Sequence, residues 1–411
     1  MNIPFAGFDD LPRLAPQTDG FPPADVPAAL SDALASLALN PGEELTVLVN
    51  DPQRHTATGT VLAALAGSVA PARTRILVAT GTHRFESGDR AGFERTIAGH
   101  RSYRQIAWHD ASADGLKPLG PCRSAATPSA ESRWRVHPWL IGGGKLLAIG
   151  SVEPHYFAGF TGAHKTCTIG VASRADIEAN HAFALSTEAG PGRLGGNPVH
   201  EGIAAAVIAL EQAAPLACVN LVQAGPVVLA AAGGGVLETL ETAADCARRA
   251  FIHSIPAPVD GLVLSVEGPL SRTFYQADKG IKNSEQAVTD GGAMVLVAAC
   301  EDGIGQDQFV RLLQDAPTCA GAKALVARRR YRLGDHKAVK LRQLTDPAER
   351  GVRVWAVCPG LDDADLRRLG FLRAHSVEEA LSQAGLQPGR DAVYGVIDAG
   401  NTVVRAGQHP A

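Results

Sequence analysis

Short apolar runs alternate with segments of helical periodicity along the first half of the chain. Apolar, β-branched runs of strand length occupy 44–50, 75–80 and 146–150. Apolar side chains recur at helical spacing over 24–39, 58–69 and 198–213. Strands that alternate with helices are typical of an α/β fold built on a mainly parallel sheet.

The alternation resumes after a proline-bearing stretch at 254–260, which we interpret as a linker. Further strands are predicted at 261–266, 292–300 and 353–358, and a helix at 376–384. The tail adds two apolar runs, which could close this second sheet or cross back to the first. We therefore expect two α/β domains with mainly parallel sheets and an active-site cleft between them. Their predicted bounds are 1–255, 256–390 and, for the tail that could return to the N-terminal domain, 391–411.

Composition narrows the class of protein. The 411 residues carry a net charge of −4 and 45% hydrophobic residues, which predicts a globular chain with neither a nucleic-acid nor a membrane partner. Seven scattered cysteines without a C-x-x-C pair favour a reducing compartment. The first ten residues lack the pattern of a secretory signal, and no apolar run is long enough for a transmembrane helix. A cytoplasmic location is expected, while the oligomeric state stays open.

Polar residues follow the predicted strands. Asp51 and His83 come after the first two strands and His155 after the third, and α/β sheets bind ligands beyond the carboxyl ends of their strands. Gly159 and Gly162 precede Lys165, and glycine allows a backbone to approach a ligand closely. Separated histidines of this kind form a metal site or are ordinary polar residues. The chain contains neither an H-E-x-x-H motif nor the Cys/His spacing of a zinc site.

The segment Glu153-Pro-His-Tyr-Phe-Ala-Gly-Phe-Thr-Gly-Ala-His-Lys165, followed by Asn180-His181, resembles the lactate racemase family. Further motifs of the family occur in the family's order before and after this segment, at 50–54, 79–83, 194–201, 275–280 and 301–305. The resemblance thus extends over most of the chain.

The resemblance implies a cofactor, the nickel-pincer nucleotide, which is a pyridinium-3,5-bisthiocarboxylic acid mononucleotide that carries Ni²⁺. Lys165 matches the lysine that is joined to it as a thioamide, and His181 matches the protein ligand of the metal. Two sulfur donors in a square-planar field suit Ni(II). Asp51, Gly159 and Gly162 match positions beside the cofactor. Cofactor-biosynthesis enzymes would be the maturation partners.

The resemblance also implies an isomerase, a racemase or epimerase of a small 2-hydroxyacid. His83 and His155 match the two histidines that act as acid and base during reversible proton-coupled hydride transfer to the cofactor. A cluster that matches the family's substrate-binding positions comprises Arg54, Tyr275, Gln276 and Lys279. Two of these assignments have plain alternatives, since Asp51 could cap the following helix and Tyr275 could be a packing aromatic.

Several positions depart from the family pattern. Ala163 and His164 stand where the family has glycine and a variable residue before the lysine, Thr161 replaces serine, and 168–170 lack the usual proline. Arg272, His164 and His55 are extra cationic side chains that could bind a second anionic group of the substrate, although surface solvation would also explain them. The identity of the 2-hydroxyacid is therefore open.

Two other functions are alternatives to a racemase or epimerase. A nicotinamide-dependent 2-hydroxyacid oxidoreductase is disfavoured because no G-x-G-x-x-G follows a strand with an acidic residue about 20 positions on. The glycine-rich segment 142–145 also lacks the spacing of a phosphate-binding P-loop, and we interpret it as a turn. A non-catalytic binder of nickel or of the cofactor would need Lys165 and His181 but neither His83 nor His155.

Overall fold

The computed structural model describes residues 9–40, 42–125 and 134–407. The prediction that the first ten residues are not a secretory signal falls mostly on residues 1–8, which lie outside these ranges. The chain divides into two compact units. The N-terminal unit comprises Thr18–Glu153 and Phe157–Ala250. The C-terminal unit comprises the described residues of Met1–Gln17, Pro154–Tyr156 and Phe251–Ala411, so the short segment with His155 groups with the C-terminal half.

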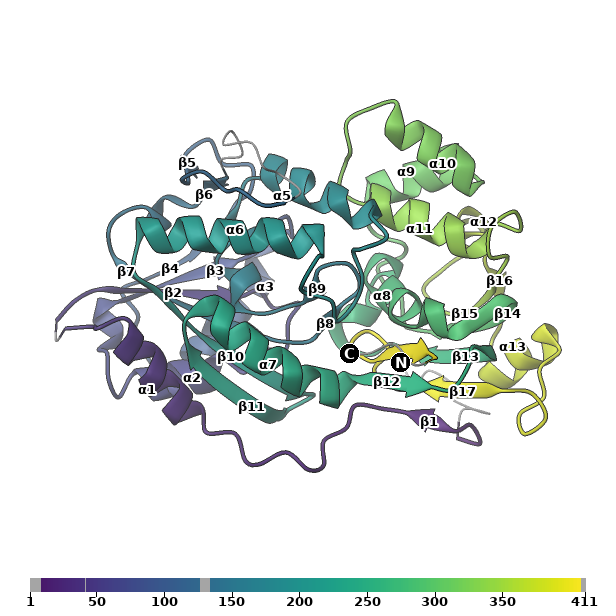
Figure 1. Cartoon of the computed structure of the whole chain (residues 1–411), viewed down its shortest axis with the longest axis horizontal. Helices are drawn as coiled ribbons and strands as arrows, with labels where there is room; N and C mark the ends of the chain where they lie inside the picture. The colour runs from purple at the N-terminus through teal and green to yellow at the C-terminus, as the bar shows by residue number, and fades with distance from the viewer. Residues whose placement is uncertain (1–8, 41, 126–133, 408–411) are drawn as a thin grey trace. The chain divides into compact units, whose positions relative to one another are not determined.

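The N-terminal unit is built on a six-stranded sheet with the order β11-β10-β7-β2-β3-β4 (Figure 1). All neighbours pair in parallel except β10 and β11. The strands are β2 Leu45–Asn50, β3 Thr74–Ala79, β4 Gln105–Trp108, β7 Lys145–Ser151, β10 Leu216–Ala224 and β11 Val227–Gly234. The helices are α1 Val26–Ser36, α2 Thr58–Leu65, α3 Ser87–Ala98, α4 Ala163–Thr166, α5 Arg174–His181, α6 Pro198–Ala213 and α7 Val236–Phe251. Short strands of this unit lie in the connections: β5 Lys117–Pro118, β6 Arg135–Val136 and β9 Gly159–Phe160, whereas β8 Pro154–His155 belongs to the C-terminal unit.

The central strands of this sheet are buried on both faces, as expected of parallel strands covered by helices. Val47 and Leu48 on β2 and Ile76 and Leu77 on β3 all have no exposed surface. Burial of both side-chain sets makes the strands continuous apolar runs, and this is the signal by which the sequence predicts them. The carboxyl ends of β2 and β3 consequently lie at one edge of a rigid sheet, with Asn50 opposite Ala79.

The C-terminal unit has a second six-stranded sheet, in the order β1-β17-β13-β14-β15-β16, and all of its pairs are parallel (Figure 1). The strands are β1 Arg13–Leu14, β13 Val259–Ser265, β14 Val288–Val297, β15 Arg353–Val357, β16 Leu372–Arg373 and β17 Val393–Val396. β12 Ile252–Ile255 pairs separately with β18 Val403–Ala406. The helices are α8 Phe274–Ser284, α9 Asp307–Asp315, α10 Cys319–Ala327, α11 Asp335–Thr345, α12 Asp363–Leu369 and α13 Val377–Ala384.

The predicted fold class, α/β with mainly parallel sheets, is confirmed. The helix predicted over 198–213 coincides with α6. The predicted linker at 254–260 is largely wrong, because β12 and β13 enter it from both sides and leave only 256–258 between them. The two prolines at 256 and 258 mark this short connection. In the tail, β17 pairs with β13 and so joins the second sheet.

Two further features concern membrane-spanning helices and the cysteines. No helix within the described ranges is both long and apolar enough to cross a membrane. Each of the seven cysteines is a free thiol, and all but Cys246 are buried.

Candidate active site

Asp51 and His83 form a pair at the carboxyl edge of the N-terminal sheet. Asp51 Oδ2 lies 2.7 Å from His83 Nδ1, and Asp51 Oδ1 accepts a hydrogen bond from the backbone N–H of Gln53 at 2.9 Å. A carboxylate only accepts, so His83 donates from Nδ1 and leaves the lone pair of Nε2 free of this contact. The alternative role of Asp51 as a helix N-cap is wrong, because α2 begins at Thr58 and its N-cap position is Ala57.

The two glycines before Lys165 have conformations that other residues would strain. Gly159 has a φ of +77°, and a Cβ there would lie 2.2 Å from the carbonyl oxygen of Arg193. Gly162 has a φ of +146°, and a Cβ would approach Asn220 Oδ1 within 3.1 Å. Asn220 Oδ1 also accepts the N–H of Ala163 at 2.8 Å, which holds the start of α4. Both glycines therefore shape the turn that presents Lys165.

Lys165 has few partners. Desolvation lowers the pKa of its amine well below the ordinary value, the nearby charge of Arg54 lowers it further, and Glu153 opposes the shift. Part of the side chain remains accessible to solvent. Among the described residues no carboxylate lies within 4.0 Å of its Nζ, and the ring centroid of Phe157 lies at 5.9 Å. The surroundings therefore favour an uncharged, nucleophilic amine.

Glu153 is a charged neighbour that the sequence analysis did not assign. Its Oε2 lies 3.7 Å from Arg54 Nη1, and the two side chains are 12% and 22% exposed. Thr161 holds the same residue, because the Thr161 N–H donates to the Glu153 carbonyl at 2.8 Å. The Glu153 N–H in turn contacts Thr161 Oγ1 at 2.9 Å. In the sequence, the position of Glu153 directly before Pro154-His155 is the pattern that could have indicated a place in the site. Glu153 therefore balances the charge of Arg54 beside Lys165.

His181 closes α5 and is 9% exposed. Burial and then the charge of Lys165 lower the pKa of its imidazole to about 3, so the ring is neutral at ordinary pH. Its Nδ1 lies 3.2 Å from Asn180 Oδ1, while Asn180 Nδ2 donates to the carbonyl of Val199 at 3.0 Å. Since the amide oxygen of Asn180 accepts, Nδ1 carries the proton and Nε2 carries a lone pair suited to a metal.

No metal-binding cluster of three or more His, Cys, Asp or Glu side chains occurs in the described part of the chain. Ligation by His181 alone would not produce such a cluster. Lys165, Arg54, Glu153 and His181 belong to one unit and interact electrostatically. Asp51 and His83 form their pair in the same unit.

The remaining predicted residues lie in the C-terminal unit. His155 is 7% exposed, and its ring stacks on Tyr156 with centroids 5.2 Å apart. Tyr275, Gln276 and Lys279 lie on α8, whose N-cap Thr273 accepts the N–H of Gln276, and all three are partly exposed. The ring of Tyr275 also packs against Phe309 at 5.6 Å. The packing role and a partly exposed surface thus coexist at Tyr275.

Two buried residues at the start of α11, His336 and Lys337, were missed by the sequence analysis. Lys337 Nζ donates to the carbonyl of Tyr275 at 2.8 Å and pairs with Asp278 at 3.1 Å. Nothing local distinguishes these two residues from other polar residues at a helix start. Only their neighbours in space reveal them.

Two of the three extra cations, Arg272 and His164, have surroundings that account for them. Arg272 Nε lies 2.9 Å from Asp302 and 3.4 Å from Glu301. His164 has no exposed surface, and burial lowers the pKa of its ring well below the ordinary value. Arg272 thus lies beside two carboxylates and His164 is a buried ring that burial keeps neutral, so neither offers a free positive charge for a second anion. Lys145, from the glycine-rich segment 142–145, pairs with Glu43 and donates to the carbonyl of Ala38 at 2.6 Å, which supports the turn interpretation.

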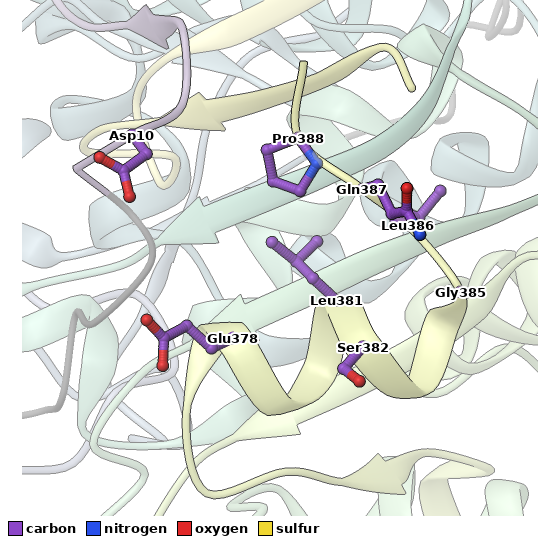
Figure 2. A pocket seen from close by; sticks show the side chains of 8 residues that line it. All are labelled: Asp10, Glu378, Leu381, Ser382, Gly385, Leu386, Gln387 and Pro388. Carbon is purple, nitrogen blue, oxygen red and sulfur yellow. The ribbon is translucent and has the colours of Figure 1, made fainter. Parts of the chain in front are cut away.

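A cavity of about 560 Å³ lies beside α13 in the C-terminal unit (Figure 2). Its lining comprises Asp10, Glu378, Leu381, Ser382, Gly385, Leu386, Gln387 and Pro388. This lining includes two acidic side chains and no basic one, so it does not suit the carboxylate of a 2-hydroxyacid. It also contains none of the candidate site residues.

Sequence comparison connects both halves of the chain to one family. A family model of the lactate racemase N-terminal domain matches residues 25–192, and a model of the lactate racemase C-terminal domain matches residues 258–405. The lactate racemase of Thermoanaerobacterium thermosaccharolyticum is 29% identical over 60% of this chain and 56% of its own length. That of Lactiplantibacillus plantarum is 31% identical over 60% of this chain and 57% of its own length. The chain thus spans less than two thirds of these relatives.

Solved structures give a likeness of fold. The lactate racemase apoprotein from Thermoanaerobacterium thermosaccharolyticum matches with a TM-score of 0.79 at 22% identity, over 97% of this chain and 96% of that chain. A protein from Thermotoga maritima matches with a TM-score of 0.73 at 16% identity, over 93% and 97% of the two chains. Since the two domain models match consecutive parts that make up most of the sequence, the chain belongs to the lactate racemase family.

Proposed function

We propose that the chain is a racemase or epimerase of a 2-hydroxyacid that works with a nickel-pincer nucleotide attached at Lys165. The observation that carries this proposal is the desolvated amine of Lys165, which has no carboxylate within 4.0 Å among the described residues. The lactate racemases to which the chain is similar supply the reaction class. Lactate is the first substrate to test.

The chemistry of the site fits such a cofactor. An uncharged amine is the form of lysine that attacks an acyl carbon. Its condensation with a thiocarboxylic acid group would release water and leave a neutral thioamide, so burial would avoid the cost of an unpaired ammonium. The Nε2 lone pair of His181 would serve as the protein ligand of nickel. When bound, the cofactor would supply the acceptor for the hydride that leaves Cα of the substrate.

The protein's own task is to move the hydroxyl proton. His83 would take or return that proton at Nε2, because Asp51 holds the proton of Nδ1 and stabilises the charged ring. His155 would do the same for the opposite enantiomer. Racemisation presents the hydroxyl in two mirror-related arrangements, which is why two bases are needed.

Binding of the substrate would fall to cations and hydrogen-bond donors. Arg54 would hold the carboxylate, since a guanidinium binds it with two parallel N–H groups. Its distance of 3.7 Å to Glu153 leaves this contact weak enough to be replaced. Tyr275, Gln276 and Lys279, which share the exposed part of α8, would contact the rest of the substrate.

The decisive experiment is intact mass measurement after co-expression with cofactor-making enzymes, followed by peptide mapping and a chiral assay with L- and D-lactate. We expect a mass adduct on the peptide that contains Lys165, and interconversion of the enantiomers. Lys165→Ala should show neither, whereas Lys323→Ala, at a half-exposed lysine, should show both. An adduct without interconversion of any 2-hydroxyacid would indicate a binding protein, and active protein with unmodified Lys165 would refute the assignment.

A further inference from the structure

His336 and Lys337, at the start of α11, are consecutive and almost completely buried, with 1% and 3% exposure. They contact Tyr156, Tyr331, Tyr275 and Asp278, all within the C-terminal unit. Polar side chains buried in this way are retained where their hydrogen bonds are satisfied. One of these partners, Tyr156, directly follows His155 in the chain.

Both ring nitrogens of His336 contact tyrosine hydroxyls. Nε2 lies 2.9 Å from Tyr156 Oη, and Nδ1 lies 2.5 Å from Tyr331 Oη. A neutral imidazole has one N–H and one lone pair, so one hydroxyl donates to the ring and the other accepts from it. Rotation of His336 would break both contacts. The hydroxyl of Tyr156 is therefore held at a defined point.

Tyr156 passes this restraint to His155. Its ring is 4% exposed and stacks on the His155 imidazole at 5.2 Å with an interplanar angle of 20°. Burial raises the pKa of Tyr156 well above its ordinary value, so the hydroxyl keeps its proton and remains a neutral hydrogen-bonding group. Lys337 Nζ lies 4.7 Å from the centroid of the same ring. Ring position and hydroxyl direction are thus both restrained.

Lys337 joins this arrangement to α8. Its Nζ also lies 4.7 Å from the ring centroid of Tyr275, donates to the Tyr275 carbonyl at 2.8 Å and pairs with Asp278 at 3.1 Å. His336 and Lys337 therefore link two residues of the proposed site: His155, through the ring of Tyr156, and Tyr275.

We propose that His336 is a positioning residue, which holds the His155 imidazole, through Tyr156, in the orientation that proton transfer requires. This inference rests on the proposed function, because it takes His155 to exchange a proton with the substrate hydroxyl. Stacking alone lets two rings slide past each other, whereas the hydrogen bonds at the far end of Tyr156 stop that movement. A displacement of about 1 Å at a reacting group costs about a hundredfold in rate.

The first test needs no cofactor. Full-length protein with ¹⁵N-labelled histidine is examined by NMR, and the His155 signals are assigned with His155→Gln. Tyr156→Phe keeps the ring and removes the hydroxyl, and His336→Gln removes the imidazole; both should shift and broaden the His155 signals. Tyr103→Phe is the matched control, since its hydroxyl is buried in the N-terminal unit without a hydrogen-bond partner among the described residues. Unchanged His155 signals in both test variants would overturn the proposal.

The second test uses cofactor-loaded protein. Tyr156→Phe and His336→Gln should lower kcat by about ten- to a hundredfold with KM within about twofold, because substrate binding is kept and proton transfer is misaligned. Tyr331→Phe should lose less, and Tyr103→Phe should match the wild type. Wild-type kcat in Tyr156→Phe would overturn the proposal. A wild-type protein that interconverts no 2-hydroxyacid would refute the proposed function instead, and the NMR result would still decide whether His336 positions His155.

Discussion

Lys165 in the N-terminal unit and Lys337 in the C-terminal unit are both desolvated lysines, and burial lowers the pKa of each. Their partners differ. Lys337 has Asp278 at 3.1 Å, a backbone carbonyl at 2.8 Å and two tyrosine rings at 4.7 Å. Lys165 has one aromatic ring at 5.9 Å, and no carboxylate of the described chain lies within 4.0 Å of it.

The histidines of the two units have different kinds of partner. His336 has a hydroxyl at each ring nitrogen, whereas His181 has the Asn180 amide at Nδ1 and a pKa lowered to about 3. Burial alone therefore does not distinguish a reactive group from a structural one. Partners do, because a satisfied buried group holds its neighbours in place, whereas burial of an amine with no carboxylate within 4.0 Å favours its uncharged, nucleophilic form.

The largest expected effect is on folding stability. Lys337→Met would leave the Asp278 carboxylate buried without its cation, and loss of one partner of a buried pair costs about 3–5 kcal/mol. Lys165→Met, which removes a desolvated amine, should leave stability unchanged or raise it. Urea unfolding of the cofactor-free protein measures both. Lys337→Met combined with Asp278→Asn should recover part of the loss, and equal losses at the two lysines would remove the basis of the comparison.

The next effect concerns His83, which a single carboxylate holds. His83→Ala should lower kcat by about a hundredfold or more, the scale of general acid–base catalysis. Asp51→Asn, which keeps the size of the side chain and removes its charge, should cost less. Racemisation of lactate by the loaded variants is the measurement, with bound cofactor confirmed by mass. Activity of His83→Ala near that of the wild type would exclude its role as a base.

A smaller effect is expected from the proposed substrate cations. Arg54→Ala and Lys279→Ala should each lower kcat/KM by an amount equivalent to about 2 kcal/mol. If both bind one substrate, the double variant should lose clearly less than the sum of the two. Strictly additive losses would show that the two residues act independently. Arg342→Ala offers a contrast, because this arginine donates to the carbonyls of Ala316, Leu369, Leu313 and Arg368 and should lose stability instead.

An effect of about the same size is a pH dependence of stability at His200, a buried histidine whose ring centroid lies 5.5 Å from that of His164. Burial lowers the pKa of His200 to about 4. Between its ordinary value near 6.5 and about 4, the unfolded chain binds a proton that the folded chain does not, so stability falls as pH falls through this window. Relative to the wild type, His200→Phe should gain about 2 kcal/mol on going from pH 7.5 to pH 5. Parallel unfolding curves for the two proteins would contradict the prediction.

Local sequence patterns predicted the framework of both units. β2 and β3 are continuous apolar runs because both of their faces are buried, and α6 has the periodicity of a half-buried helix. The place of Asp51 and His83 after neighbouring parallel strands follows from the same pattern. Strands β1 and β16, with two residues each, were not predicted, because so short a segment carries no period of its own.

The sequence by itself determined the alternation of the main strands and helices, the family and the lysine that its motif singles out, because each depends on residues close together along the chain. Only the tertiary structure decided which charged groups have partners. Glu153 meets Arg54, and Lys337 meets Asp278 and Tyr275, across 59 or more positions of the chain. Desolvation and pairing set the charge state of a buried side chain, and both are properties of its neighbours in space.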